Sequence, residues 1–322
     1  MLQQRHSGEA TVIQPQLFES VNITARLRLK NRIVLAPLYY EWDFGSRAFM
    51  RFFEARARGG AALAMVPVPT HGGLSDLEKA SFAGKSRPFL DMMHSFDCKV
   101  VPQIFSGVGE QINQFSVNEL AVLPQEFARA AGTLHQLGYD GIGIHGAHHS
   151  LFMSLISPLI NQRTDQFGGN EQNRFRLPLD TVNAMHKACP ALPVFYRFSA
   201  VDFVDNGFDI GMAVRFAAAL ELAGAMCIDV SAGGTVLSPQ YSDAPLDEAG
   251  DACFAKYSAA IKQHVNIPVI VAGRINSRAV AETIIRNNNA DLVAIGRMLV
   301  KNADWPNNIR NEVMADETVP LP

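Results

Sequence analysis

Short apolar runs recur along the whole chain, and each is followed by a turn and then by a stretch with helical spacing. Eight such runs are present, at residues 33–36, 62–66, 100–103, 141–145, 194–198, 227–231, 269–272 and 292–295. Continuous apolar runs of this length that alternate with helices are typical of a parallel sheet covered on its outer face. We therefore predict one buried strand for each run.

The segments between these runs carry apolar residues at the spacing of an amphipathic helix. Three stripes are clear: Phe49, Phe52, Phe53 and Ala57; Phe127, Ala131, Leu134 and Leu137, stopped by Gly138; and Val214, Phe216, Ala217 and Leu220. Eight strand–helix units in 322 residues favour a closed barrel over an open sheet. The expected fold class is α/β, a single (β/α)8 TIM barrel over residues 17–322, preceded by a polar extension over residues 1–16.

Composition and charge exclude several classes of protein. The net charge is −3 and no basic block is present, which argues against nucleic-acid binding. No apolar run reaches the roughly 18 residues of a membrane span, and the polar N-terminus has no signal-peptide pattern. The four cysteines are scattered without a CxxC pair, so we expect reduced thiols and a cytoplasmic protein. Charged residues make up 18%, which is compatible with a surface partly covered in a homo-oligomer.

Polar residues follow the predicted strands where each strand ends, and barrel enzymes build their active sites at those ends. The first strand leads into Ala36, Pro37, Leu38, Tyr39 and Tyr40; later strands end at Gln103, at His145 with His148, at Arg197, at Gly273-Arg274 and at Gly296-Arg297. We therefore expect an amide, two imidazoles and three guanidinium groups to converge at one mouth.

The two Gly-Arg pairs follow consecutive strands, the seventh and the eighth. Glycine lets the backbone come close to a ligand, free N–H groups bind anions, and the arginine fork matches phosphate oxygens. Barrels often hold phosphate at these two exits. The alternative, an ordinary strand-to-helix turn with surface arginines, fits one such pair better than two. We expect a ligand that carries a phosphate.

Gln103 and Arg197 suit a heteroaromatic ring that has carbonyl groups and ring nitrogens. A cation beside an electron-accepting ring stabilises the charge that builds there on reduction. Taken alone, Arg197 fits a buried salt bridge equally well.

His145 and His148 stand three residues apart at one strand exit, so both rings can face one side of a turn. Two imidazole N–H groups there could hold and polarise a carbonyl oxygen. A zinc site that also uses His149 is an alternative, but the neighbouring exits offer arginines where a metal needs carboxylates. We expect no metal. A purely structural role for the histidine pair stays open.

At this point the chain resembles the Old Yellow Enzyme family of FMN-dependent ene-reductases, from about residue 17 to residue 309. The segments that carry the resemblance are Leu29-Lys-Asn31 through Pro37, His145-x-x-His148, Ser157-Pro158 through Asn161-Gln-Arg-Thr-Asp165-x-Phe-Gly168-Gly169, Asp291 through Arg297, and Asp304-Trp-Pro-Asn. The resemblance implies bound FMN, NAD(P)H as the reductant, and a small conjugated carbonyl substrate whose activated C=C bond is reduced.

The resemblance also implies a role for each strand-end residue. Those expected to bind FMN are Ala36, Pro37 and Leu38 along the ring, Gln103 and Arg197 at its pyrimidine edge, and Gly273, Arg274, Gly296 and Arg297 at its phosphate. His145 and His148 would bind the carbonyl oxygen of the substrate above the ring.

Two departures from the family bear on catalysis. Ser150 stands where the family usually has the tyrosine that protonates the substrate, and an aliphatic hydroxyl is a far weaker acid than a phenol. Tyr39, Tyr40 and His149 are the substitute donors to consider, with a wall role as the alternative for each. Tyr39 also stands where the family places a small Cys or Thr beside the flavin.

Three functions follow, and the sequence leaves all of them open. The first is an FMN-dependent oxidoreductase that reduces α,β-unsaturated carbonyl compounds. The second, suggested by Ser150 and Tyr39, is a redox-neutral isomerase or a desaturase of a biosynthetic pathway with the same FMN site. The third is a barrel without catalytic activity that binds a phosphorylated ligand.

Overall fold

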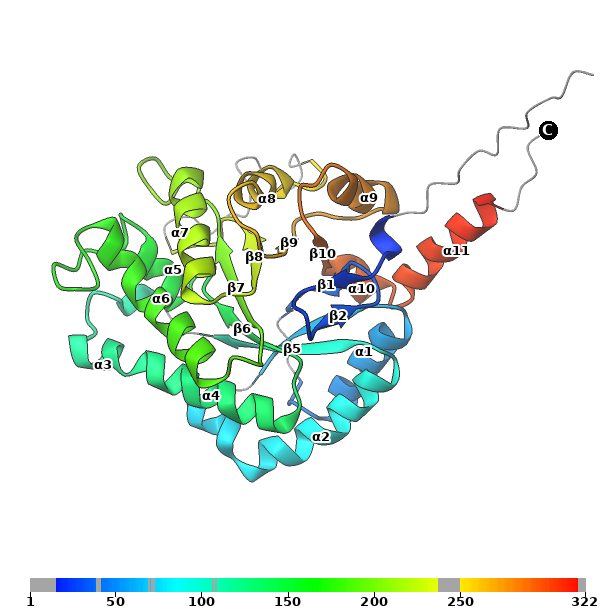
Figure 1. Ribbon diagram of the computed structural model, residues 1–322, viewed down its shortest axis with the longest axis horizontal. Coiled ribbons are helices and arrows are strands. Elements are labelled where there is room, and N and C mark those ends of the chain that lie inside the picture. Colours follow the sequence, from blue (N-terminus) through cyan, green and yellow to red (C-terminus); the bar gives the residue numbers. More distant parts are fainter. Residues whose placement is uncertain are drawn as a thin grey trace, which may run out of the picture.

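A closed barrel of eight parallel strands forms the centre of the molecule (Figure 1). The computed structural model describes residues 16–38, 42–68, 70, 73–105, 107, 109–236 and 250–317. The barrel strands are β3 (Ile33–Leu35), β4 (Leu63–Pro67), β5 (Lys99–Phe105), β6 (Ile142–His145), β7 (Val194–Ser199), β8 (Cys227–Ser231), β9 (Val269–Val271) and β10 (Leu292–Ile295). The predicted (β/α)8 fold class is confirmed.

The strands follow one another around the barrel in chain order, and β10 closes it against β3. Each of the eight predicted runs becomes one of these strands, with boundaries shifted by no more than two residues at either end. Ala36, predicted as the end of the first strand, lies one residue beyond β3, although its N–H still donates to Ile295 O at 3.0 Å. Apolar runs thus located the strands correctly because every one is buried on both faces.

Helices cover the outside of the barrel (Figure 1). The longer ones are α1 (Arg47–Arg58), α2 (Ala80–Ser95), α4 (Leu123–Leu137), α6 (Glu171–Ala188), α7 (Ile210–Ala223), α8 (Ala255–Lys262), α9 (Arg278–Arg286) and α11 (Trp305–Glu317). Shorter segments are η1 (Gln16–Phe18), η2 (Leu74–Glu78), η3 (Gly109–Gln111), α3 (Val117–Ala121), α5 (Leu151–Ile156) and α10 (Arg297–Lys301). In the described part of the chain, no helix has both the length and the apolar character needed to cross a bilayer.

The three predicted helical stripes lie on α1, α4 and α7 and pack against the strands. Most of their members are buried, whereas Leu137 and Val214 at the ends of two stripes are half-buried. Gly138 ends α4 in the left-handed conformation, with φ of 92°, as expected for a helix stopped by glycine.

Apolar residues form two layers, one inside the barrel and one between strands and helices. Successive residues of a strand point to opposite faces. On β7, Phe195 therefore packs inside the barrel, whereas Tyr196 and Phe198 pack outward against Phe216 of α7. Arg197, the next residue after Phe195 on the inner face, is thereby directed toward the mouth.

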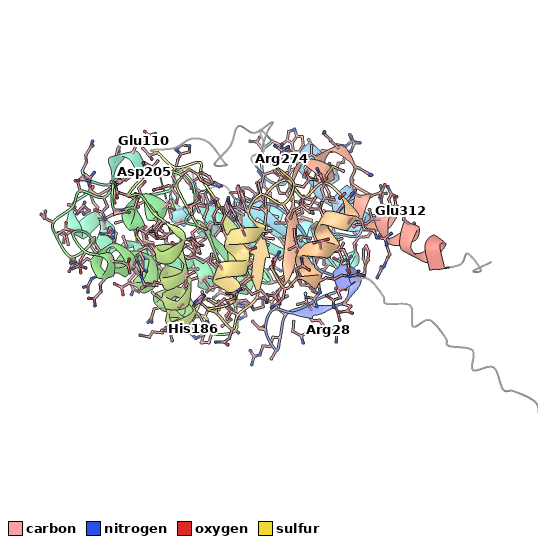
Figure 2. The ribbon with its side chains drawn as sticks, turned by 90° about the horizontal axis from the view of Figure 1, so that it is seen from above. Arg28, Glu110, His186, Asp205, Arg274 and Glu312 are labelled. Atoms are coloured by element: carbon pink, nitrogen blue, oxygen red, sulfur yellow. The ribbon has the colours of Figure 1, made fainter. Side chains whose placement is uncertain are left out.

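A two-stranded hairpin packs against the inner layer at the opposite end of the barrel from the mouth. Its strands are β1 (Val21–Asn22) and β2 (Arg28–Leu29), and Ile23, Leu27 and Leu29 join the apolar cluster inside the barrel. Figure 2 shows Arg28 of this hairpin and Arg274 of the mouth at opposite edges of the molecule. This hairpin was not predicted from the sequence, because two-residue strands are too short to show periodicity.

The phenylalanines of α1 and α2 supply a sharp test of the outer layer. Phe53 is fully buried, with ring centroids 4.6 Å from Phe49 and 5.4 Å from Phe89. We expect Phe53→Ala to lower the free energy of unfolding by about 3–5 kcal/mol, because it leaves a cavity in a packed core. Denaturant unfolding monitored by circular dichroism measures the change. The control is Leu222→Ala, where the side chain is 90% exposed and the expected change is below about 0.5 kcal/mol. Equal losses in the two variants would contradict this account.

Candidate active site

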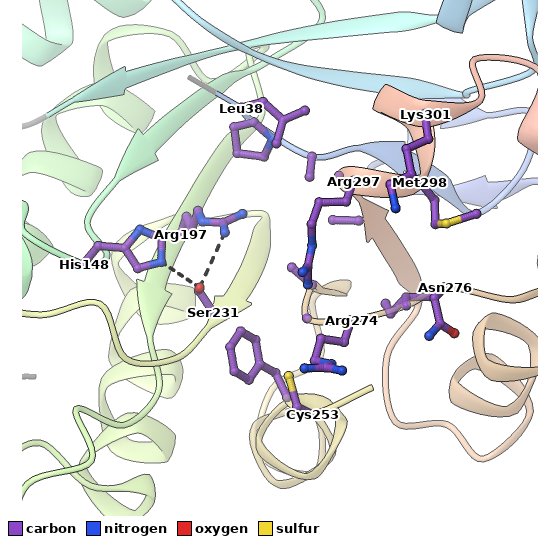
Figure 3. A pocket seen from close by; sticks show the side chains of 18 residues that line it. Leu38, His148, Arg197, Ser231, Cys253, Arg274, Asn276, Arg297, Met298 and Lys301 are labelled. Atoms are coloured by element: carbon purple, nitrogen blue, oxygen red, sulfur yellow. Dashed lines mark hydrogen bonds between the residues drawn. The ribbon is translucent and has the colours of Figure 1, made fainter. Parts of the chain in front are cut away.

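A cavity of about 550 Å³ opens at the carboxyl ends of the strands. Its lining comes from the ends of β3, β7, β8, β9 and β10 and from the loop after β6 (Figure 3). The predicted residues that line it are Ala36, Pro37, Leu38, His148, Arg197, Gly273, Arg274, Gly296 and Arg297. Strands that are far apart in sequence therefore deliver these side chains to one place, as the barrel topology requires.

One part of the cavity is strongly cationic. Arg274, Arg297 and Lys301 all line it, the last from the end of α10 (Figure 3). The carboxylates of the described residues contribute nothing to this lining. Three positive charges with so little acidic compensation favour an anionic group, and an arginine fork matches phosphate.

The two glycines of the Gly-Arg pairs leave room that a side chain would fill. Gly273 has a φ of 104°, and a Cβ there would lie 2.6 Å from a ring carbon of Phe254. At Gly296 a Cβ would lie 3.3 Å from Leu38 Cδ2. Arg274 also adopts a left-handed backbone, with φ of 53°. The chain therefore turns sharply at β9 and exposes its backbone to the cavity.

A buried ion pair lies on the inner face of the barrel, next to the cavity. Arg197 Nη1 donates to Asp229 Oδ2 at 2.9 Å, and the two residues are directly paired in the register of β7 and β8. Both are buried, Asp229 completely. Burial raises the pKa of Asp229, and the guanidinium of Arg197 opposes that rise. The salt bridge that the sequence analysis kept as an alternative for Arg197 is thus present, and the same side chain still lines the cavity.

Unsatisfied polar atoms near the mouth indicate where a polar ligand could bind. Among the described residues, Gln103 Nε2 and Arg197 Nε are buried without a hydrogen-bond partner. Such orphan donors are costly unless a ligand or water accepts from them. Gln103 does not line the cavity itself, but it lies on β5 in register with β6, two residues before the level of His145.

The two histidines lie close together, as predicted. His145 is the last residue of β6, His148 follows in a turn with φ of 59°, and the ring centroids are 5.2 Å apart. His148 lines the cavity, whereas His145 stands behind it and contacts the ring of Phe105 at 5.6 Å. Burial, reinforced by the charge of Arg197, lowers the pKa of His145 to about 3. The same causes lower the pKa of His148 well below its ordinary value. Both rings are therefore neutral hydrogen-bonding groups at neutral pH.

Ser150 is turned away from the cavity. It is completely buried as the N-cap of α5, where its Oγ accepts from Met153 N at 3.2 Å. The hydroxyl that replaces the family's tyrosine therefore serves the helix end. This geometry agrees with the expectation that Ser150 is a poor proton donor to a substrate.

The segment that carries the most specific part of the resemblance organises the loops around the site. Asn161 Nδ2 donates to Leu155 O at 2.7 Å and to Phe167 O at 2.8 Å. Arg163 Nη1 donates to Phe115 O at 2.6 Å, in the loop that follows β5. Arg163 thereby ties the segment after α5 to the loop after β5, whereas Asn161 ties α5 to the segment around Phe167. Neither side chain lines the cavity.

Some of the predicted site residues lie outside the part of the chain that the structure describes. Tyr39 and Tyr40 lie outside the described residues, and so does most of the polar extension at residues 1–16. Four further residues at or beside the cavity were not predicted from the sequence: Asp229, Lys301, Cys253 and Phe254. Asp229 alone had a signal, because a carboxylate in the middle of a buried strand needs a partner. Among the residues that the structure describes, no three His, Cys, Asp or Glu side chains are grouped so that they could hold a metal ion.

The cavity fits a planar cofactor with a phosphate tail. Its volume lies within the roughly 300–1,000 Å³ of typical cofactor sites, it has a cationic region, and orphan donors adjoin it. A flavin mononucleotide, which has a planar ring and a phosphate, would meet these requirements.

Known proteins resemble this chain in sequence and in fold. The model of the NADH:flavin oxidoreductase / NADH oxidase family matches residues 86–316. The chain is 30% identical over 91% of its length to an NADH oxidase of Thermoanaerobacter brockii, of which it spans 50%. It is 30% identical over 88% of its length to an NADPH dehydrogenase of Bacillus pumilus, of which it spans 91%. A structure of morphinone reductase in complex with tetrahydroNAD has a TM-score of 0.73 at 19% identity, covering 93% of this chain and 91% of that one. The structural likeness shows a common barrel fold.

The neutrality of the two imidazoles can be measured directly. We expect His145, whose pKa is lowered to about 3, to take up no proton between pH 8 and pH 5 in the folded protein, and we expect His148 to take up its proton only well below its ordinary range. Nitrogen-15 NMR of the imidazoles follows this, with His145→Gln and His148→Gln to assign the signals. Since the unfolded chain protonates both rings near pH 6.5, acidification from 6.5 toward 3 should remove stability, at most about 1.4 kcal/mol per pH unit for each ring. A midpoint near 6.5 for either ring would contradict the assigned burial.

Proposed function

The chain belongs to the NADH:flavin oxidoreductase / NADH oxidase family, and we propose that it is an FMN-dependent oxidoreductase that reduces the activated C=C bond of a small α,β-unsaturated carbonyl compound. Members of this family bind FMN and use NADH or NADPH. One observation carries the proposal: a single cavity combines a cationic region at the ends of β9 and β10 with a neutral imidazole from the loop after β6.

In this proposal the cofactor is held by groups that the cavity already presents. Arg274 and Arg297, with the backbone at Gly273 and Gly296, bind the phosphate, and Lys301 adds a third positive charge. Ala36, Pro37 and Leu38 line the ring. Arg197 and Gln103 donate to its pyrimidine edge, which would satisfy their orphan nitrogens. When bound, FMN would supply the hydride-transfer chemistry between the nicotinamide and the activated C=C bond.

His145 and His148 orient and polarise the substrate. Neutral imidazole N–H groups can donate to the carbonyl oxygen, and this interaction strengthens as negative charge develops on that oxygen. With pKa values so far below neutrality, the imidazoles hold no spare proton to give to the α-carbon. We assign that proton delivery to Tyr39 or Tyr40, because Ser150 is committed to the cap of α5.

The phosphate assignment predicts a change in flavin affinity. Arg297→Ala should weaken FMN binding about tenfold to a hundredfold, since a charge-assisted hydrogen bond contributes roughly 1.5–3 kcal/mol. Titration of FMN into apoprotein, followed by quenching of flavin fluorescence, gives the dissociation constant. Arg129→Ala, at an exposed arginine of α4, is the matched control and should bind FMN as the wild type does. Equal affinity in the two variants would remove the phosphate argument.

The reaction assignment predicts reoxidation of the reduced protein by an enone. After anaerobic reduction by NADPH, addition of 2-cyclohexen-1-one should restore the spectrum of oxidised flavin. The variant His145→Ala/His148→Ala should keep its FMN yet be reoxidised about 10²–10³ times more slowly, the usual cost of losing oxyanion-type donors. A wild-type protein that stays reduced with every enone offered would count against the reductase.

The burial of Ser150 favours one other function. A family site whose usual proton donor is replaced by a helix-capping serine suits a redox-neutral isomerase, or a desaturase that runs in the opposite direction. The same experiment separates the two. Isomerisation of a β,γ-unsaturated ketone without consumption of NADPH would support the isomerase.

A further inference from the structure

Ser231, the last residue of β8, joins the cofactor side of the cavity to the substrate side. Its side chain lines the cavity and is almost completely buried, at 2% exposed. The Oγ lies 2.8 Å from His148 Nε2 and 3.5 Å from Arg197 Nη2, as the dashed lines in Figure 3 show. One hydroxyl therefore contacts both the residue assigned to the flavin ring and a residue assigned to the carbonyl oxygen.

Chemistry alone fixes the direction of one of these two hydrogen bonds. A guanidinium group has donors and no acceptor, so Ser231 Oγ must accept from Arg197. The hydroxyl keeps one proton to donate, and His148 Nε2 lies 2.8 Å from its oxygen. A neutral imidazole that accepts at one nitrogen carries its proton on the other. If Ser231 donates its proton to Nε2, His148 carries its own proton at Nδ1.

The guanidinium that contacts Ser231 is itself held by Asp229. Asp229, two residues earlier on β8, accepts from Arg197 Nη1 at 2.9 Å and fixes the guanidinium that faces Ser231. Asp229, Arg197, Ser231 and His148 thus form a continuous chain of polar groups, of which the first three are buried and His148 is half-buried. In this chain the hydroxyl of Ser231 contacts both the guanidinium of Arg197 and Nε2 of His148.

A second serine fixes the backbone of His148 without touching its ring. Ser199 Oγ accepts from His148 N at 3.1 Å and donates to Gly233 O at 2.8 Å. His148 has a left-handed backbone, which is uncommon outside glycine and needs such support. The two serines therefore have separate roles, because Ser199 holds the backbone of His148 whereas Ser231 contacts the imidazole.

We propose that Ser231 is a positioning residue that fixes the tautomer of His148, so that a substrate carbonyl oxygen meets the Nδ1–H of this ring. The consequence of this role for substrate binding rests on the proposed function, because only a carbonyl-binding imidazole needs a defined donor nitrogen. The tautomer itself does not depend on the reaction. A misplaced proton would present a lone pair to the carbonyl oxygen and repel it.

The test compares three variants of the FMN-loaded protein. In Ser231→Ala the hydroxyl is removed, in Ser231→Thr it is retained, and in Ser199→Ala the backbone support is removed while the contact with the ring remains. Nitrogen-15 NMR of the imidazole distinguishes a protonated from an unprotonated nitrogen, and His148→Asn identifies the signals. A second readout is the dissociation constant of 4-chlorophenol, whose phenolate oxygen imitates the carbonyl oxygen and gives a charge-transfer band over oxidised flavin.

We expect His148 to be protonated at Nδ1 in the wild type, in Ser231→Thr and in Ser199→Ala. In Ser231→Ala the two tautomers should mix, and 4-chlorophenol should bind about threefold to tenfold more weakly, in line with the loss of one hydrogen bond. A wild-type ring protonated at Nε2, or an unchanged tautomer in Ser231→Ala, would overturn the role of Ser231. A wild type without a phenol band would instead contradict the proposed function, and the NMR comparison would still decide the tautomer.

Discussion

The buried ion pair of Arg197 and Asp229 is the interaction on which the candidate site depends. A carboxylate without access to solvent is tolerated inside the barrel because a guanidinium lies 2.9 Å away on the neighbouring strand. Removing one partner of such a pair typically costs about 3–5 kcal/mol, since the other charge is left uncompensated. The pair also sets the electrostatics above it: it aims a cation at the cavity and helps to keep both histidines neutral.

The mouth beside this ion pair has two chemically different regions. On one side, the ends of β9 and β10 present arginines and tightly turned backbone that suit a phosphate. On the other, His148 offers a neutral donor whose orientation is set by Ser231 and Ser199. A flavin that spans both regions would have its charged tail among cations and its ring beside an uncharged hydrogen-bonding pair. This separation is what an oxidoreductase acting on a neutral carbonyl compound requires.

The loops around this mouth are held by residues that do not take part in binding. Asn161 and Arg163 bond to backbone carbonyls of two different loops, and Ser150 caps α5 between them. A sequence signature can therefore mark a family through its scaffold as much as through its chemistry. Ser150 suits its place at the start of α5, because serine is a good N-cap.

The sequence by itself determined the barrel, because each strand is buried on both faces and each covering helix repeats its apolar residues every three or four positions. It also determined which residues stand at the strand ends, and eight of the nine expected to bind the cofactor line one cavity, with Gln103 buried nearby. Only the tertiary structure decided what those residues touch. The pairing of Arg197 with Asp229, the contact of Ser231 with His148, the approach of Lys301 and Phe254 to the cavity, and the hairpin below the barrel all join positions distant in sequence. Such contacts depend on strand register and on side-chain direction, which local patterns do not encode.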